Sequence, residues 1–266
     1  GTSMPWNDTA QLNFLLPETR RVVMDQILKV ARLFPVVRFD AAMTLTRFHY
    51  QRLWFPLPGQ GGDIPSRAGL IQDAETFDRA MPKEFWREVV DTLARETPDT
   101  LLLAEAFWMM EPYFVRHLGM HRVYHSAFMH AMLSEHNAPF RASLKGMLRE
   151  DPRLLTRFVH FLSNPDEASA LSQFGDGDRY FSAVCLQVTL PGLPMLAHGQ
   201  IEGLSEKYGM DFSRPLWREP IRHDLVDRHR KWVVPLLRER YLYAGTRHFT
   251  FFSLRTEQGH EAPHVY

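Results

Sequence analysis

Three acidic residues follow short apolar runs at widely separated places in the sequence: Asp40, Glu105 and Asp166. Two carboxyl groups held close together can cleave a glycosidic bond. One attacks the anomeric carbon, and the other, kept protonated by its surroundings, gives its proton to the leaving oxygen. A third carboxylate nearby raises the pKa of the acid by like-charge repulsion and stabilises a cationic transition state. Glycosidic chemistry is therefore a reaction to which these residue types are suited.

An arginine, Arg38, precedes Asp40 by two residues. Side chains alternate between the two faces of a strand, so Arg38 and Asp40 are expected on the same side. A guanidinium there keeps a carboxylate nucleophile ionised. A single carboxylate after a strand is more often a helix cap or a solvated loop residue. Three in the same position along the chain's strand–helix units, one of them with an arginine, favour a site.

The elements that must position these residues alternate between strand and helix. Spacings of three and four between apolar residues predict helices over about residues 17–31, 83–96, 180–189 and 223–240. Residues 46–81, rich in proline, glycine and aromatic residues, are predicted to form a long loop or a small excursion, and β-like sequence begins at residues 248–252. Continuous apolar runs predict buried strands over Val36–Asp40, Thr100–Glu105, Phe158–Asn164 and Pro194–Gln200.

Repeated strand–helix units predict a parallel sheet covered by helices. The three acidic residues then lie at the C-terminal ends of strands. Both a (β/α)8 barrel of the TIM type and a doubly wound open sheet place their sites at that edge, so this step leaves the two folds open. No GxGxxG motif or P-loop follows a predicted strand, which disfavours a nucleotide-binding function.

Composition excludes several other classes. The 266 residues contain 31 Lys and Arg against 31 Asp and Glu, a net charge of zero, which argues against nucleic acid or an acidic membrane surface as a partner. No apolar run approaches the ~20 residues that a membrane-spanning helix needs. The single cysteine excludes an intrachain disulfide and a cysteine-based zinc cluster. We see no N-terminal signal segment, which favours a cytoplasmic location.

Four short segments resemble, in the right order, conserved blocks of the α-amylase superfamily, glycoside hydrolase family 13. Residues 37–42 resemble the second block, residues 102–108 the third and residues 161–167 the fourth, and residues 192–202 are similar to the block at the eighth strand. The segment Asp8–Asn13, with Pro17 and Glu18, also resembles the family's approach to this region. Each motif is moderately specific alone, and the four in order make a strong match.

The resemblance implies roles for the acidic residues. Asp40 would be the nucleophile, Glu105 the general acid/base and Asp166 the stabiliser of the transition state, with Arg38 as the arginine of the second block. The implied reaction is cleavage or transfer at an α-glucosidic bond of an α-glucan or oligosaccharide, with retention of configuration through a covalent glycosyl-enzyme. The implied fold is a (β/α)8 barrel.

Two departures from the family pattern qualify this interpretation. Pro165 stands where the fourth block usually has histidine, so a contact to a substrate hydroxyl is missing or comes from another residue. The first block is absent, which predicts that residues 1–240 hold only strands four to eight of the barrel and that residues 241–266 begin a C-terminal β domain. Half a barrel has two open sheet edges, so we expect the chain to be a piece of a larger polypeptide.

Further residues are candidates for contact with the sugar. Trp108 and Tyr50 are predicted as stacking platforms, although core packing is the usual role of an aromatic side chain. Asn164 and His198 are predicted to line the site, with Arg38 also touching substrate. We predict no metal site in this chain. Calcium is possible in the full-length enzyme, as is common in relatives, with some ligands from the absent half.

Two other functions stay open. A transglycosidase of the same superfamily would carry the same three carboxylates and differ in whether a sugar or water accepts the glycosyl group. A catalytically inactive relative would serve as a carbohydrate-binding or scaffold subunit, typically after losing those carboxylates. The presence of all three argues against inactivity in the parent protein, while the 266 residues alone could lack activity because half the barrel is absent.

Overall fold

Two units divide the chain, Gly1–Val123 and Tyr124–Tyr266. The structure is a computed structural model that describes residues 10–60, 65–207, 218–262 and 265. Asp8 and Thr9, the first two residues of the segment Asp8–Asn13 that also resembles the family, lie outside the described residues. No helix in the described ranges is long and apolar enough to cross a membrane.

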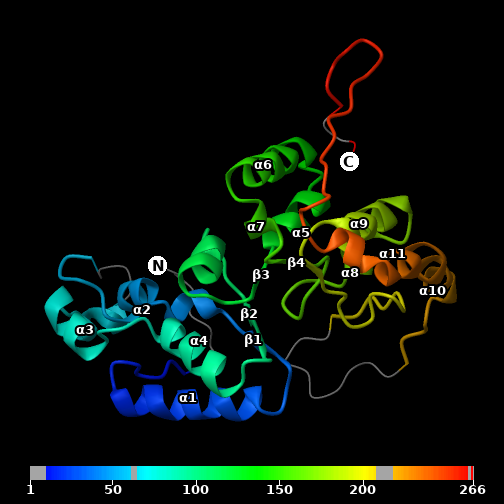
Figure 1. The fold of residues 1–266 in the computed structure, drawn as a ribbon. Helices are drawn as coiled ribbons and strands as arrows, with labels where there is room; N and C mark the ends of the chain where they lie inside the picture. Colours follow the sequence, from blue (N-terminus) through cyan, green and yellow to red (C-terminus); the bar gives the residue numbers. More distant parts are fainter. Residues whose placement is uncertain (1–9, 61–64, 208–217, 263–264, 266) are drawn as a thin grey trace. The chain divides into compact units, whose positions relative to one another are not determined.

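The first unit contains parallel strands, as predicted. β1 (Val36–Phe39) pairs with β2 (Leu101–Ala104) over its whole length, and β2 pairs with β3 (Arg122–Tyr124), within which the boundary between the units falls. Two long helices lie side by side in this unit, α1 (Pro17–Ala31) and α4 (Phe85–Glu96) (Figure 1). Their bounds agree closely with the helices predicted from apolar spacing.

A buried stripe explains why α4 forms where it does. Phe85, Val89 and Leu93 recur at intervals of four residues and are completely or almost completely buried. The helix therefore gains most of its stability from packing one face against the unit's core. That core is rich in aromatic rings, among them Phe14, Tyr50, Phe55, Phe77, Phe85 and Trp86.

Of the two alternatives predicted for residues 46–81, the long loop is wrong, and the described residues form a small helical excursion. This segment contains α2 (Arg47–Trp54), the 3-10 helix η2 (Pro65–Leu70) and α3 (Ala74–Ala80), after the short 3-10 helix η1 (Ala42–Leu45). Buried side chains anchor the helices despite the proline and glycine content: Tyr50 and Leu53 in α2, and Phe77 in α3. The carboxylate of Asp73 caps α3 by accepting a hydrogen bond from the amide of Thr76, at 2.7 Å.

The second unit has two short parallel strands, β4 (Phe158–His160) and β5 (Leu193–Pro194), paired through Val159 and Leu193. The backbone N–H of His125, just after β3, donates to the carbonyl of Val159, at 3.0 Å. α9 (Asp178–Thr189) confirms the helix predicted over residues 180–189. The π-helix η3 (Tyr113–His117) precedes β3 and belongs to the first unit. Between β3 and α9 lie the helices α5 (Ser126–Leu133), α6 (Asn137–Glu150), α7 (Pro152–Leu155) and α8 (Ala170–Phe174).

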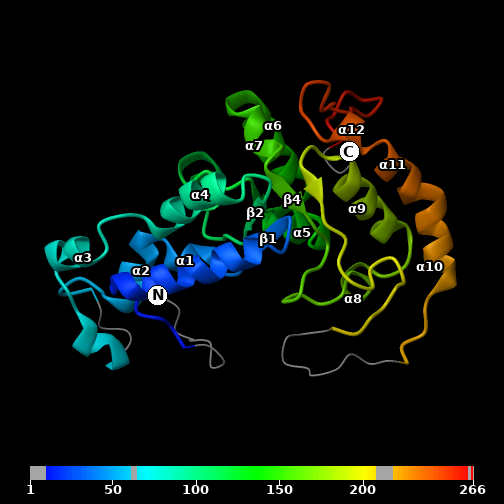
Figure 2. The ribbon, with the colours of Figure 1, turned by 60° about the horizontal axis from the view of Figure 1, so that its bottom comes forward.

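The helix predicted over residues 223–240 is present as a run of short helical segments beside α9 (Figure 2). These are α10 (His223–Arg228), the π-helix η4 (His229–Val233), α11 (Val234–Arg238) and α12 (Arg240–Tyr243). The π-helix η4 ends at Val233, two residues before Pro235, which has no backbone N–H to donate in the first turn of α11.

Two strand predictions in the second unit are wrong. β5 ends at Pro194, and the predicted continuation to Gln200 is irregular chain and turns. No strand forms over residues 248–252 either. That segment instead contacts α6, where Arg141 donates to the carbonyl of Phe252 at 2.7 Å and its guanidinium lies 4.5 Å from the ring centroid of Phe251. The assignment of residues 241–266 to a C-terminal β domain stays a prediction.

Candidate active site

Neighbouring strands place Asp40 and Glu105 at the same edge of the first unit's sheet. Phe39, the last residue of β1, is in register with Ala104, the last residue of β2, so each acidic residue comes directly after its strand. Two backbone hydrogen bonds extend the pairing past the strand ends. The amide of Glu105 donates to the carbonyl of Phe39 at 3.0 Å, and the amide of Ala42 donates to that of Glu105 at 2.9 Å. The two side chains therefore start from a rigid backbone.

Arg38 bridges the two carboxyl groups. One terminal nitrogen of its guanidinium lies 2.7 Å from Oδ1 of Asp40, and the other lies 2.9 Å from Oε2 of Glu105. The sequence predicted the contact with Asp40 from the spacing of two residues. It did not predict the contact with Glu105, which depends on the pairing of β1 with β2.

Glu105 is held on the inner side of the site. Only 5% of its side chain is exposed, and its Oε2 also accepts a hydrogen bond from the amide of Ala41, at 2.9 Å. Ala41 has a left-handed backbone conformation, with φ of 40°, which is uncommon for a residue other than glycine and is consistent with a constrained turn at this site. Burial raises the pKa of the Glu105 carboxyl above its ordinary value. The neighbouring Asp40 carboxylate raises it further, whereas the Ala41 amide and the Arg38 guanidinium oppose the rise.

The pair is suited to acid and nucleophile roles because the two environments differ. Asp40 has 58% of its side chain exposed and an ion pair with Arg38. Glu105 is buried with a raised pKa, which favours its protonated form. Carboxylate oxygens of the two residues lie within 4.8 Å of each other. That closeness is compatible with the ~5–5.5 Å between carboxyl groups in enzymes that retain configuration.

The two aromatic candidates have different environments. Trp108 follows β2 and is 41% exposed, with its ring against that of His49 (4.9 Å between centroids) and the guanidinium of Arg52 over its face. Tyr50 is buried in the core, where its hydroxyl accepts from the amide of Phe14 and donates to the carbonyl of Leu12, both at 2.9 Å. A ring buried on both faces offers no platform to a sugar, so the prediction for Tyr50 is corrected to a structural role.

The second unit carries Asp166, Asn164 and His198. Asp166 is exposed on the loop after β4, and its backbone N–H donates to Oδ1 of Asn164 at 2.9 Å. The same oxygen accepts from the amide of Glu167, also at 2.9 Å, so Asn164 fixes the turn that contains Pro165. The roles of Asp166, Asn164 and His198 in catalysis and binding stay predictions, as does the meeting of Asp166 with Asp40 and Glu105.

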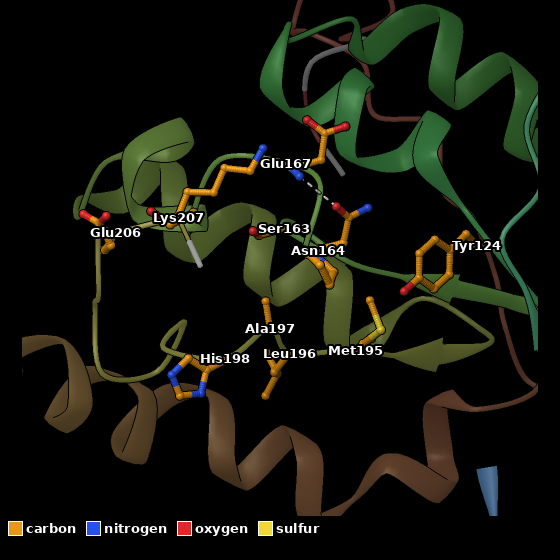
Figure 3. A pocket seen from close by; sticks show the side chains of 12 residues that line it. Tyr124, Ser163, Asn164, Glu167, Met195, Leu196, Ala197, His198, Glu206 and Lys207 are labelled. Carbon is orange, nitrogen blue, oxygen red and sulfur yellow. Dashed lines mark hydrogen bonds between the residues drawn. The ribbon is translucent and has the colours of Figure 1, made fainter. Parts of the chain in front are cut away.

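A pocket of about 280 Å³ opens in the second unit beside this turn (Figure 3). Asn164, Pro165 and Glu167 line one side, and Met195–His198 form a wall after β5. Glu206 and Lys207 also line it, and the ammonium group of Lys207 donates to the backbone carbonyl of Asp166 at 2.5 Å. Sequence reasoning missed both residues. Their only signal was a position a few residues beyond the segment that resembles the family's eighth-strand block.

The carboxylates do not form a convincing cation site. Asp40 and Glu105 come close enough to share a metal ion, but both already contact the positive guanidinium of Arg38. An arginine between two carboxylates offsets part of the negative charge that would attract calcium and occupies oxygens that would bind it. We therefore assign no metal to these residues, and calcium elsewhere in a longer protein stays a prediction.

Comparison with solved structures identifies the fold. A cyclic α-maltosyl-(1→6)-maltose hydrolase from Arthrobacter globiformis aligns over 92% of this chain and 49% of its own, with a TM-score of 0.61 and 16% identity. An α-amylase from H. orenii aligns over 90% and 48%, with a TM-score of 0.56 and 18% identity. A debranching enzyme from Nostoc punctiforme aligns over 91% and 49%, with a TM-score of 0.57 and 16% identity.

The chain has an α-amylase-type fold. The resemblance expected from the four sequence blocks is thereby confirmed in the structure, as an α/β fold with parallel strands. The chain spans about half the length of these solved structures. No protein-family model matches the sequence, and no curated protein sequence matches it. At 16–18% identity the similarity to these structures shows the fold and does not show the activity.

Proposed function

We propose that the chain is the second half, strands four to eight, of the catalytic barrel of a retaining glycoside hydrolase. Its substrates would be α-glucans or related oligosaccharides, cleaved at α-glucosidic bonds. Asp40 is the nucleophile and Glu105 the general acid/base. The names of the similar structures, an α-amylase, a debranching enzyme and a maltose-containing-sugar hydrolase, support this class of substrate.

One observation carries the proposal: Arg38 bridges an exposed and a buried carboxyl group at the ends of two paired parallel strands. A core ion pair would need only one carboxylate for one arginine. Here two carboxyl groups share the cation within 4.8 Å of each other, and burial favours protonation of just one of them. A difference in pKa between neighbouring carboxyl groups is what separates a nucleophile from an acid.

The reaction proceeds in two displacements. A carboxylate oxygen of Asp40 attacks the anomeric carbon, the glycosidic C–O bond breaks, and Glu105 gives its proton to the departing oxygen. The sugar is then held as an ester on Asp40. In the second step Glu105, now a carboxylate, takes a proton from water as the water oxygen attacks the same carbon and Asp40 departs. Two inversions give net retention.

The remaining candidates complete the proposal. Asp166 stabilises the positive charge that develops on the sugar ring, and Arg38 holds the carboxylate of Asp40 in position. Trp108 supplies an aromatic face beside the site, and Asn164 and His198 line the sugar pocket of the second unit. We also propose that the chain works joined to the rest of a barrel within a larger polypeptide, called the full polypeptide below. Its spanning of about half of each similar structure supports this.

The test is a product assay on the full polypeptide with maltoheptaose. Proton NMR during the first minutes distinguishes the α from the β anomer of the new reducing end. We expect shorter maltooligosaccharides that appear as the α anomer first. Products longer than maltoheptaose would instead indicate a transglycosidase of the same superfamily. No product of any length from a folded protein would contradict the proposed activity and favour a carbohydrate-binding or scaffold relative.

A further inference from the structure

The pocket wall formed by Met195–His198 is not held by the sheet. β5 ends at Pro194, and its pairing with β4 closes on a single further bond, from the amide of Met195 to the carbonyl of His160, at 2.8 Å. From there the chain is irregular as far as Gln200. Irregular chain beside a pocket needs some other support to keep one shape.

A buried glutamine of α9 supplies that support. Gln187 is completely buried, and its amide nitrogen donates to the carbonyl of Met195 at 2.6 Å and to that of His160 at 3.3 Å. Both partners are carbonyls, which can only accept, so the orientation of the Gln187 amide is fixed. Its side-chain oxygen then accepts from the amide nitrogen of Gln200, at 3.1 Å.

Gln200, which is hydrogen-bonded to Gln187, in turn binds the backbone of the wall. It is 4% exposed, and its side-chain oxygen accepts from the backbone N–H of Ala197 at 3.1 Å. The two glutamine amides therefore hold the wall at both ends, at the carbonyl of Met195 and the amide of Ala197. The turn beyond is closely packed, because a Cβ on Gly199 (φ 75°) would come within 2.8 Å of the Leu204 side chain.

A second buried pair fixes the backbone of Gln200 itself. The hydroxyl of Tyr180, also on α9, donates to the carbonyl of Gln200 at 3.1 Å and lies 2.8 Å from Nε2 of His229. The hydroxyl has one proton, so His229 donates to it through Nε2–H. Nδ1 of His229 is then an unprotonated acceptor, and no group among the described residues donates a hydrogen bond to it.

We propose that Gln187 is a positioning residue that, paired with Gln200, sets the shape of the wall Met195–His198 and the place of His198 in the pocket. The proposal rests on the proposed function only for the identity of the ligand, a maltooligosaccharide. The shape of the wall is a property of the chain alone. Gln187 does not touch the pocket, so its effect on a ligand must pass through Met195 and Gln200.

The chemistry of the pair requires amides. In Gln187→Met a side chain of similar length fills the space, but the carbonyl of Met195 and the amide nitrogen of Gln200 lose their partner inside the protein. In Gln200→Met the amide of Ala197 loses its acceptor while Gln187 keeps both backbone contacts. Val188→Ala is the matched control, because Val188 is the next residue of α9, completely buried and apolar. It weakens packing without touching the network.

Two readouts on the full polypeptide, carrying Asp40→Asn so that maltotriose is not consumed, test the proposal. Hydrogen exchange at the amide of Ala197 reports the wall directly, and maltotriose binding by calorimetry reports the pocket. We expect exchange at Ala197 about tenfold or more faster in both glutamine variants and about tenfold weaker maltotriose binding. Val188→Ala should lower the melting temperature and leave both readouts as in the wild type.

Each outcome decides between the alternatives. Wild-type exchange at Ala197 in Gln187→Met would overturn the proposal, and so would equal acceleration in Val188→Ala, which would show general loosening of the helix. If Gln187→Met does not fold, Gln200→Met decides by the same criteria. If the full polypeptide with Gln187 and Gln200 intact does not bind maltotriose, the proposed ligand is wrong, while the exchange rates still test the positioning of the wall.

Discussion

Water reaches the two carboxyl groups of the candidate site very differently. The side chain of Asp40 is 58% exposed, and that of Glu105 is 5% exposed. Burial disfavours a charged carboxylate and raises its pKa, so Glu105 keeps its proton to a higher pH than an ordinary glutamate. The guanidinium of Arg38 contacts both groups and lowers the pKa of Glu105. The net rise in that pKa therefore comes from burial and from the nearby Asp40 carboxylate.

Replacing Glu105 by glutamine tests its role as an acid. Glu105→Gln should slow cleavage of maltoheptaose by about 10²–10⁴-fold, because a sugar leaving group needs a proton. Cleavage of an activated aryl α-glucoside should be much less affected in the step that releases the phenol. Glu111→Gln is the control, since burial also raises the pKa of Glu111 but nothing places it in the reaction. Equal losses on both substrates would remove Glu105 as the acid.

Tyr50 shows where residue type alone misleads. Its hydroxyl accepts from the buried amide of Phe14, so Tyr50→Phe leaves that donor without its partner. We expect the free energy of unfolding of the chain to fall by about 1–3 kcal/mol, measured by urea denaturation, with sugar binding unchanged. Tyr113→Phe loses only a 3.4 Å contact with Glu84 and should cost less. Loss of maltotriose binding in Tyr50→Phe at full folding would restore a role in binding.

The site was partly predictable because its parts lie at strand ends. Asp40 and Glu105 could be placed from apolar runs, and the Arg38–Asp40 contact from an interval of two. The contact between Arg38 and Glu105 could not, since it depends on which strands pair and in which register. The exposure of a tyrosine likewise depends on packing that a linear sequence does not display.

At the scale of elements, the strands follow their apolar runs and the errors have identifiable causes. The helices of residues 46–81 were missed because their prolines and glycines lie between short helices anchored by buried rings. β5 was predicted too long because the apolar residues after Pro194 are held by glutamine side chains instead of a neighbouring strand. Helix α4 was predicted well since its apolar spacing repeats over three turns.

Two histidines are buried together between elements of the second unit. Nδ1 of His125 lies 3.1 Å from Nδ1 of His160, and Nε2 of His160 lies 2.8 Å from the carbonyl of Pro191. A carbonyl accepts, so His160 carries its proton on Nε2, and His125 donates to the bare Nδ1. Burial lowers the pKa of both, that of His160 to about 4, and Arg240 adds to the lowering for His160.

This pair predicts sensitivity to acid. In the unfolded chain a histidine has a pKa of about 6.5. Between that pH and about pH 4 the unfolded chain therefore binds protons at these histidines that the folded chain does not bind. The free energy of unfolding therefore keeps the full contribution of the pair above about pH 6.5, and it falls as the pH drops from there toward about 4. The melting temperature of the chain should therefore fall as the pH is lowered from 7.5 to 4.5. His125→Asn should make this fall smaller, and the control His136→Asn, at an exposed histidine, should leave it unchanged. An equal slope in His125→Asn would contradict the account.

At the scale of the whole molecule, apolar side chains stay exposed around the start of β1. Leu33, Phe34 and Val36 are 67%, 57% and 52% exposed. Exposed apolar residues beside a strand promote association. The α-amylase-type fold matched over half the length of the similar structures supports our proposal that further chain covers this region in the full polypeptide.

The isolated 266 residues should therefore self-associate. Light scattering after size exclusion, over a range of concentrations, should show species larger than the 31.1 kDa monomer. Phe34→Lys should shift the distribution toward monomer, because it places a charge in the exposed apolar segment. Ile71→Lys is the control, at another exposed apolar residue of the same unit. A monomer at every concentration would contradict the expectation of an uncovered half-barrel.

The central claim is that Asp40 forms a covalent bond to the sugar. A 5-fluoro-α-glucosyl fluoride would test it most directly, since the activated fluoride departs readily and the ring fluorine slows release of the sugar from the enzyme. Peptide mass spectrometry of the full polypeptide should then find one fluoroglucosyl group, on Asp40, and none in Asp40→Asn. A label on another carboxylate, or turnover of the reagent with inversion and no label, would contradict the assignment of Asp40 as the nucleophile.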